Sequence, residues 1–369
     1  MLGGVNFNGR LIVLLSTYFI KKFNLLRNLK SFEIVVFFIF IISSSRIHGQ
    51  EPSFNQYLST ANTLNPAITG IFSGKYQFQG NFKNQWSQIM YPYVTGIMEG
   101  QMHILDDKIG SNDLVSFALL GVIDKSNDGG FRRSQVGGTI SFHKALDPDG
   151  VHRLGAGFQL MYNNYTLDYD RLTFQSQFRP YIGYDPSVAS GEGAGFTDGA
   201  FDFSSGFMYS FITEDVTAFL GGSGYHLNMT PISTQISSFA IPRRWVVHGS
   251  LSIPAFEADR LYGSFSHQWS TVTNMTTLGV VYGKNLNGYF NDEADEFLVG
   301  GFLRFKDSFS PYVGYRKQAL TVGLSYDFTT SYLRKSSNLT GSLELGIRYK
   351  LFEYYKEQQK KVKCDFLIW

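Results

Sequence analysis

The chain has 369 residues, of which 16% are aromatic and only 17% are charged, against about 25% charged residues in an ordinary soluble domain. Its mean hydropathy of -0.10 argues against a bundle of membrane-spanning helices, and its net charge of +2 gives no indication of a nucleic-acid partner. The single cysteine excludes an intrachain disulfide and a cysteine-based metal site. This combination is typical of a transmembrane β-barrel, in which only alternate residues face lipid.

Residues 1–49 have the pattern of an export signal. An unbroken apolar run, Ile34 to Ile42, follows several basic residues and precedes small residues, with a cleavage point predicted before Gln50. The run is too short to cross the membrane, which takes about 20 residues. The residues before Leu25 are interpreted as an over-long start, because a leader beginning there would have ordinary length. A non-cleaved anchor is the alternative.

The next segment, residues 50–72, is polar and rich in Asn and Thr. It lacks the alternation of a strand, and its Asn65-Pro66 pair predicts a fixed turn. The sequence therefore predicts either a periplasmic lead-in to a barrel or a plug.

From residue 73 to residue 352 one pattern repeats, with about ten residues of alternating apolar and polar side chains followed by a turn rich in Gly, Asn or Asp. In the first repeat, Tyr76 and Phe78 share one parity, and Gln77 and Gln79 share the other. Since successive side chains of a strand point to opposite faces, each repeat has one apolar face and one polar face.

The repeats predict about fourteen strands, an even number as in single-chain outer-membrane barrels. We place them near residues 74–86, 93–105, 114–125, 131–144, 150–163, 198–211, 215–227, 243–255, 259–271, 275–285, 294–305, 308–317, 319–328 and 342–352. The longer connections, Arg171 to Gly199 and Thr230 to Ile241, are predicted extracellular loops.

A soluble β-sandwich would show the same alternation. The export signal and the aromatic residues near strand ends favour a membrane barrel, whose closure leaves no unpaired edge in lipid. We therefore predict an all-β fold, a transmembrane antiparallel up-and-down β-barrel in the cell outer membrane.

No HExxH, GxSxG or P-loop motif is present, nor a GxGxxG between a strand and a helix. Three pairs of side chains are candidates for chemistry: His143 with His152 for a metal, and His248 with Ser250 or His267 with Ser266 for a hydrolase. Chance placement is the better interpretation of each pair. We expect no catalytic residue, no metal and no cofactor.

Residues 353–369 differ from the repeats. They are rich in lysine and continue past the last predicted strand to Cys364 and Trp369. A docking segment for a periplasmic partner and a solvated end are both compatible with this composition.

Several segments resemble one family. They read PSFNQY at 52–57, LNPAITG at 64–70, KNQW at 83–86, SYDFTTS at 325–331 and GSLEL at 341–345. In this order they are similar to the patterns P-x-F-x-Q-Y, L-N-P-A-x-x-G, R-x-Q-W, Y-D-F-x-x-S and G-x-x-E-L of the PorP/SprF family of the Bacteroidetes type IX secretion system.

The chain departs from the family pattern at Lys83, where Arg is usual, and at Ser87, where Pro often follows. Its Cys364-Asp365-Phe366 differs from the usual Cys-Pro ending. These departures concern what the tail contacts and leave the predicted fold unaffected.

The resemblance implies a non-enzymatic outer-membrane component that supports secretion or surface display of proteins with a type IX C-terminal signal domain, such as gliding adhesins. The implied partners are outer-membrane lipid, the secreted cargo, and periplasmic or outer-membrane secretion components. Asn65, Pro66 and Cys364 are candidate partner contacts because they fall in family-like segments. An outer-membrane porin or substrate-specific channel is the alternative, and an outer-membrane hydrolase is a third hypothesis.

Overall fold

The computed structural model describes residues 53–87, 91–105, 112–193, 195–233, 238–256, 258–271, 274–288, 295–332 and 340–351. The chain divides into two compact units, and all described residues belong to the second, His48–Trp369. The predicted signal peptide and the basic tail with Cys364 lie outside the described residues.

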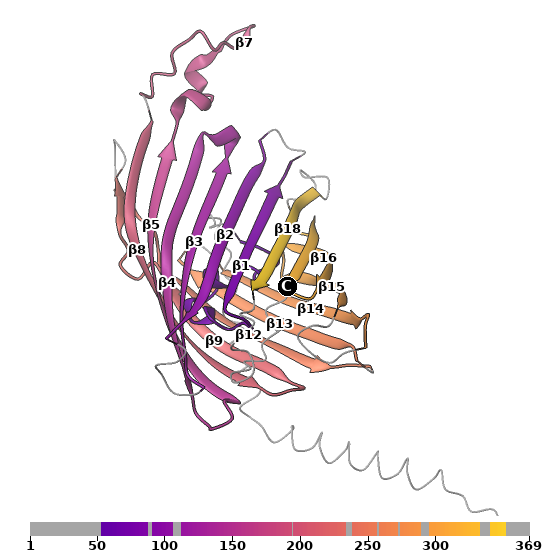
Figure 1. Cartoon of the computed structure of the whole chain (residues 1–369). Helices are drawn as coiled ribbons and strands as arrows, with labels where there is room; N and C mark the ends of the chain where they lie inside the picture. Colours follow the sequence, from indigo (N-terminus) through magenta and orange to yellow (C-terminus); the bar gives the residue numbers. More distant parts are fainter. Residues whose placement is uncertain are drawn as a thin grey trace, which may run out of the picture. The chain divides into compact units, whose positions relative to one another are not determined.

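Fourteen strands form one closed barrel in which each strand pairs antiparallel with its neighbours (Figure 1). They are β1 (Tyr76–Gln85), β2 (Tyr93–Ile104), β3 (Leu114–Ser126), β4 (Phe131–Ala145), β5 (His152–Leu167), β8 (Phe196–Ile212), β9 (Thr217–Tyr225), β12 (Arg244–Pro254), β13 (Arg260–Ser270), β14 (Asn274–Asn285), β15 (Glu296–Arg304), β16 (Ser308–Lys317), β17 (Leu320–Thr329) and β18 (Thr340–Leu351). The predicted strand number and order are confirmed, and the bounds differ by only a few residues.

The barrel closes between its first and last strands. β1 pairs with β18 without interruption, from Tyr76 opposite Leu351 to Gln85 opposite Ser342. Closure gives every strand two hydrogen-bonded neighbours, which is the condition for placing a sheet in hydrocarbon. Among the described residues there is no helix with the length and hydropathy that crossing a membrane requires.

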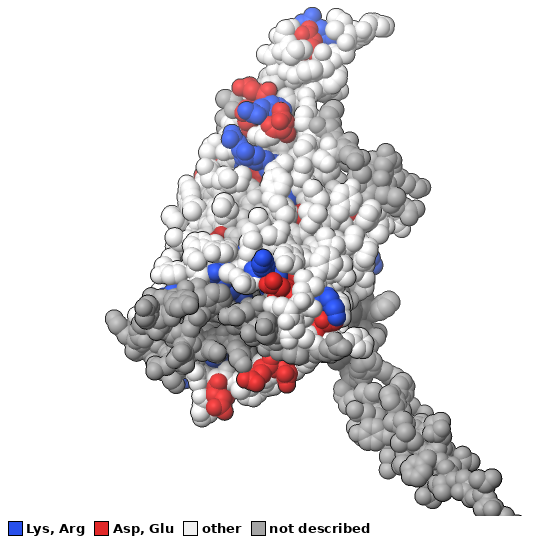
Figure 2. Space-filling model, turned by 45° about the vertical axis from the view of Figure 1, so that its right-hand side comes forward, with Lys and Arg blue, Asp and Glu red and all other residues white. Residues whose placement is uncertain are grey.

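The outer face of the barrel is apolar. Phe78 and Phe207 are 50% and 67% exposed there, whereas the alternate residue Gln79 is only 5% exposed because it points inward. In Figure 2, charged side chains on the visible face gather above and below a broad band almost free of them. A wall that exposes this much apolar surface fits lipid and excludes the soluble sandwich.

The inner face is less uniform than the alternation predicted. Most inward side chains are polar, but two groups of buried apolar ones interrupt them. A small group on β2, β3 and β5 packs with Phe54. A larger one runs from β12 to β16 and includes Val246, Tyr262, Val281, Leu298, Phe302 and Tyr312. They pack with Leu58, Leu64 and Ile68 from the N-terminal side of β1. The wall is apolar here because it faces another part of the chain, so the predicted polar face is not polar throughout.

Residues 53–73, here called the lumen segment, lie inside the barrel. Nearly all of them are buried, and two short 3-10 turns interrupt the segment, η1 (Ala61–Thr63) and η2 (Pro66–Ile68). Side chains from strands around the whole wall hydrogen-bond to it, including Ser264 of β13, Gln159 of β5 and Arg348 of β18.

The two ends of the barrel differ. At the short-turn end, where β1 begins and β18 ends, strands are joined by turns such as 146–151 and 213–216. At the opposite, long-loop end lie connections 168–195 and 226–243, with the hairpins β6 (Phe178–Arg179) to β7 (Gly183–Tyr184) and β10 (Pro231–Ser233) to β11 (Ser238–Ala240). The first hairpin rises at the top of Figure 1. Because extracellular loops of such barrels are the longer ones, we infer that the long-loop end faces outward.

A lipid-facing charge tests the assignment of faces. Leu119 lies near the middle of β3 and is 59% exposed on the outer face. Leu119→Arg should lower the free energy of unfolding by about 2–4 kcal/mol, because the charge would lie near the bilayer midplane. Urea unfolding in lipid vesicles measures this. Ile182→Arg, in the exposed tip of the β6–β7 hairpin, is the control and should change it by less than about 0.5 kcal/mol. Equal effects would contradict the assignment.

Candidate functional site: the lumen segment and its anchors

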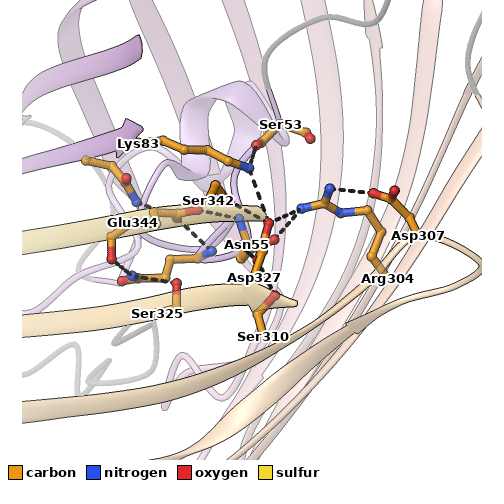
Figure 3. Close-up of polar contacts among 12 residues, drawn as sticks. Ser53, Asn55, Lys83, Arg304, Asp307, Ser310, Ser325, Asp327, Ser342 and Glu344 are labelled. Carbon is orange, nitrogen blue, oxygen red and sulfur yellow. Dashed lines mark hydrogen bonds and ion pairs between the residues drawn. The ribbon is translucent and has the colours of Figure 1, made fainter. Parts of the chain in front are cut away.

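The first anchor of the lumen segment is a buried polar cluster at the long-loop end of β1, β15, β17 and β18 (Figure 3). We call it the latch cluster. It consists of Asn55 with Lys83, Arg304, Asp327 and Glu344, which are all between 0% and 7% exposed. Strand alternation places the four charged side chains inward, where each meets the beginning of the lumen segment.

Glu344 holds the backbone of the segment. Its carboxylate accepts the main-chain N–H groups of Asn55 at 2.8 Å and Gln56 at 2.9 Å, together with the amide of Asn81 at 2.8 Å. Hydrogen bonds to a carboxylate are stronger than those between neutral groups. One buried side chain therefore ties the segment to β18 and, through Asn81, to β1.

Asp327 organises the other half of the cluster. It accepts hydrogen bonds from the Asn55 amide and from the hydroxyls of Ser310 and Ser342. Two cations lie near it, Arg304 at 3.5 Å and Lys83 at 4.0 Å. Asp327 thus has both the donors and the opposite charges that a buried carboxylate requires.

The two cations also contact the segment itself. Lys83 donates to the main-chain carbonyl of Ser53 at 2.6 Å, and Arg304 donates to the side-chain oxygen of Asn55. Arg304 additionally pairs with Asp307, in the turn after β15, at 2.7 Å. The charges of the wall therefore depend on the lumen segment for part of their hydrogen bonding.

Gln56 fits a hollow in the wall formed by paired glycines. Gly323 of β17 and Gly346 of β18 are opposite each other, and a Cβ on either would lie within 2.9 Å of the Gln56 amide oxygen. The Gln56 amide nitrogen donates to Ser325 at 3.3 Å and to the Glu344 carbonyl at 3.2 Å. A larger residue at either glycine would occupy the space of the glutamine.

The second anchor is the turn at Asn65-Pro66. Asn65 has extended backbone, as expected before proline, and its side-chain oxygen accepts the N–H of Ala67 at 2.9 Å. Its amide nitrogen donates to the Phe207 carbonyl at 3.0 Å and lies 2.9 Å from Nε2 of His248. The fixed turn expected from Asn-Pro is present, with its amide bound to the wall.

Glycines again make room for this turn. A Cβ on Gly157 of β5 would lie 2.3 Å from the main-chain carbon of Pro66, and one on Gly206 of β8 would lie 2.0 Å from the Asn65 side-chain oxygen. The two glycines are opposite each other in the sheet. In the barrel order, six strands separate β8 from β17 on either side. The lumen segment therefore spans the barrel between opposite walls.

The candidate partner contacts Asn65 and Pro66 are thus both buried, and Cys364 lies outside the described residues. Their role in partner contact stays a prediction. For Asn65 and Pro66 it requires the lumen segment to leave the barrel.

The geometry separates two of the three pairs considered for chemistry. His143 is buried and faces inward, with Nε2 3.0 Å from the Thr69 carbonyl, whereas His152 has the outward parity of β5 and contacts Tyr209. Ser266 is buried inward, while the adjacent His267 stacks on Trp269 of the outer face. His248 and Ser250 both face inward, and His248 contacts Asn65. Within the described residues, no three His, Cys, Asp or Glu side chains could jointly hold a metal ion.

The latch cluster was not predicted as a site. All of its members except Arg304 lie in the family-like segments, and its four charged residues have the polar parity of their strands. What the sequence could not give is their convergence, since Asn55 and Glu344 are 289 positions apart.

A closed barrel with an apolar outer face and a polar interior defines an outer-membrane β-barrel protein. The chain belongs to the PorP/SprF family, because residues 47–349 match the family described as type IX secretion system membrane protein PorP/SprF. The family-like segments at the two ends of the sequence meet in the latch cluster, with Asn55 and Gln56 from one end and Asp327 and Glu344 from the other.

Chains similar to this one occur among solved structures. The translocator domain of the autotransporter NalP from Neisseria meningitidis has 11% identity and a TM-score of 0.40, covering 80% of this chain and 96% of that one. A FadL homologue from Pseudomonas aeruginosa has 12% identity and a TM-score of 0.45, covering 78% and 92%. At these values the likeness carries no functional conclusion. No match was found among curated proteins.

The glycines that make room for the Asn65-Pro66 turn predict a steric effect of substitution. Gly206→Ala should lower the free energy of unfolding by about 1–3 kcal/mol, because its Cβ would overlap the Asn65 side chain. Gly121→Ala is the control, since its Cβ would point outward and meet its nearest neighbour, the Gln135 carbonyl, at 3.8 Å. Urea unfolding and limited proteolysis of the lumen segment measure both variants. If Gly206→Ala is as stable and as resistant as Gly121→Ala, the turn does not rest on β8.

Removal of the two acidic partners of Arg304, Asp327 and Asp307, should lower the stability of the barrel by unequal amounts. The Asp327 side chain is 4% exposed and that of Asp307 is 41% exposed. Asp327→Ala should cost about 3–5 kcal/mol of stability, because it removes the buried carboxylate that Lys83 and Arg304 share. Asp307→Ala should cost about 1 kcal/mol or less, as for exposed pairs. Chemical unfolding of the two variants under one condition gives the comparison, and a difference near zero would show that the latch cluster does not hold buried charge.

Proposed function

We propose that the protein is a plugged, non-enzymatic outer-membrane scaffold that supports secretion or surface display of proteins with a type IX C-terminal signal domain, gliding adhesins among them. Membership of the PorP/SprF family supports the secretion role. The observation that carries the scaffold role is the lumen segment, which fills the barrel interior and is anchored on opposite walls.

A pore requires a continuous water-filled path, and the filling of this lumen argues against one. Leu58, Ala67 and Ile68 are 1% exposed or less and pack against apolar residues of the wall. Cargo recognition is therefore assigned to the rim and loops of the barrel. The porin or substrate-specific channel predicted as the alternative becomes an outcome of the test.

The remaining parts of the chain complete the proposal. Residues 1–49 act as a cleaved signal peptide, and residues 353–369, with Cys364, act as a periplasmic docking segment for other secretion components. The tail follows β18, which ends at the short-turn end together with the start of β1. By loop length this end faces the periplasm, as docking of the tail requires.

Deletion of the gene should selectively remove proteins with type IX C-terminal signal domains from the secreted and surface proteome. Purified protein should give no steady conductance in planar bilayers, because the lumen segment fills the barrel.

Complementation with the full chain should restore the proteome. A chain ending at residue 352 should fold but fail to restore it, if the tail is the docking segment.

An unchanged secreted proteome with altered solute uptake, together with stepwise conductance of the purified protein, would contradict the scaffold role and support the channel. Restoration by the shortened chain would overturn the role of the tail alone.

A further inference from the structure

The two ends of the lumen segment lie at opposite ends of the barrel. The carbonyl of Ser53 is bound by Lys83, two residues before the end of β1. The hydroxyl of Ser73 lies 3.3 Å from the amine of Lys350, one residue before the end of β18. Since β1 and β18 run in opposite directions, Ser53 is near the long-loop end and Ser73 is near the short-turn end.

The other contacts at the start of the segment place it at the same level. Arg304, which contacts Asn55, is the last residue of β15, and its second partner Asp307 belongs to the turn between β15 and β16. Ser342, which donates to Asp327, and Glu344 lie among the first five residues of β18. Figure 3 shows Ser53 and Asp307 within this one group of contacts.

We propose that the mature chain begins on the outer face of the outer membrane, at the long-loop end of the barrel. Cleavage before Gln50 leaves three residues ahead of Ser53, which reach about 10 Å at full extension. Return to the short-turn end would require about 20 Å, because Lys83 is six residues along β1 from Gln77. The chain ahead of Ser53 is too short for that path, which the rest of the segment already occupies.

This arrangement makes the plug accessible from outside. A secreted protein that docks at the long-loop end would therefore approach the end of the barrel at which the lumen segment begins. The inference rests on the signal-peptide cleavage and the barrel orientation given under the proposed function. It does not depend on the secretion role, so the path of the chain and that role can fail separately.

An epitope placed between Glu51 and Pro52 of the full chain tests the proposal on intact cells. Antibody should bind without permeabilisation of the outer membrane. A second epitope between Tyr181 and Ile182, in the β6–β7 hairpin, should behave identically. A third between Glu214 and Asp215, in the β8–β9 turn, should be stained only after permeabilisation. Intact mass of the purified protein should show that the mature chain begins near Gln50.

Three outcomes would overturn the proposal: staining of the Glu51 epitope only after permeabilisation, staining of the Glu214 epitope on intact cells in place of the Tyr181 epitope, or a mature chain that retains residues 1–49. Heat-modifiable migration on a gel shows that each tagged barrel is folded.

If the tag prevents folding, Ser53→Cys in a Cys364→Ser background replaces it. This substitution leaves the latch contact in place, because Lys83 binds the main chain of Ser53. Labelling of intact cells by a membrane-impermeant maleimide then supports the proposal, and labelling only after permeabilisation overturns it.

Discussion

The carboxylate of Glu344 is the contact on which the interior of the barrel depends. Buried in the wall, it accepts the main-chain N–H groups of Asn55 and Gln56, so it fixes where the lumen segment begins. A buried carboxylate without donors would be strongly destabilising, and a segment without this acceptor would lose its first anchor. Wall and segment therefore satisfy each other, and neither has its complete set of hydrogen bonds alone.

Other contacts in the interior likewise pair the wall of the barrel with the lumen segment. Lys83, Arg304 and Asp327 place further charges around Asn55, and paired glycines in β17 and β18 make space for Gln56. On the opposite wall, paired glycines in β5 and β8 receive the Asn65-Pro66 turn. Between the two anchors, apolar side chains of the segment pack on the apolar wall of β12 to β16. The segment thus connects opposite walls of the barrel and also occupies its lumen.

Most of the barrel was predictable because one rule, alternation, acts locally in every strand. Neighbours such as Tyr76 and Gln77 point to opposite faces of a strand whatever the rest of the chain does. Fourteen runs of this alternation, separated by turn residues, predict the observed order of strands. The site was not predictable in this way. The Asn-Pro turn follows from local chemistry, but its contact with Gly157 and Gly206 depends on how β5 and β8 meet the segment. The apolar inward residues such as Val281 break the alternation for the same reason, because their partner is distant in sequence.

Hydrogen exchange of the main-chain amides in the lumen segment tests the central claim most directly. The amides of Asn55, Gln56 and Gly70 donate to the buried side chains of Glu344 and Gln101, so they should exchange as slowly as amides within the barrel strands. Exchange of these amides at the rate of exposed loops, in a protein whose strands remain protected, would show that residues 53–73 do not fill the barrel.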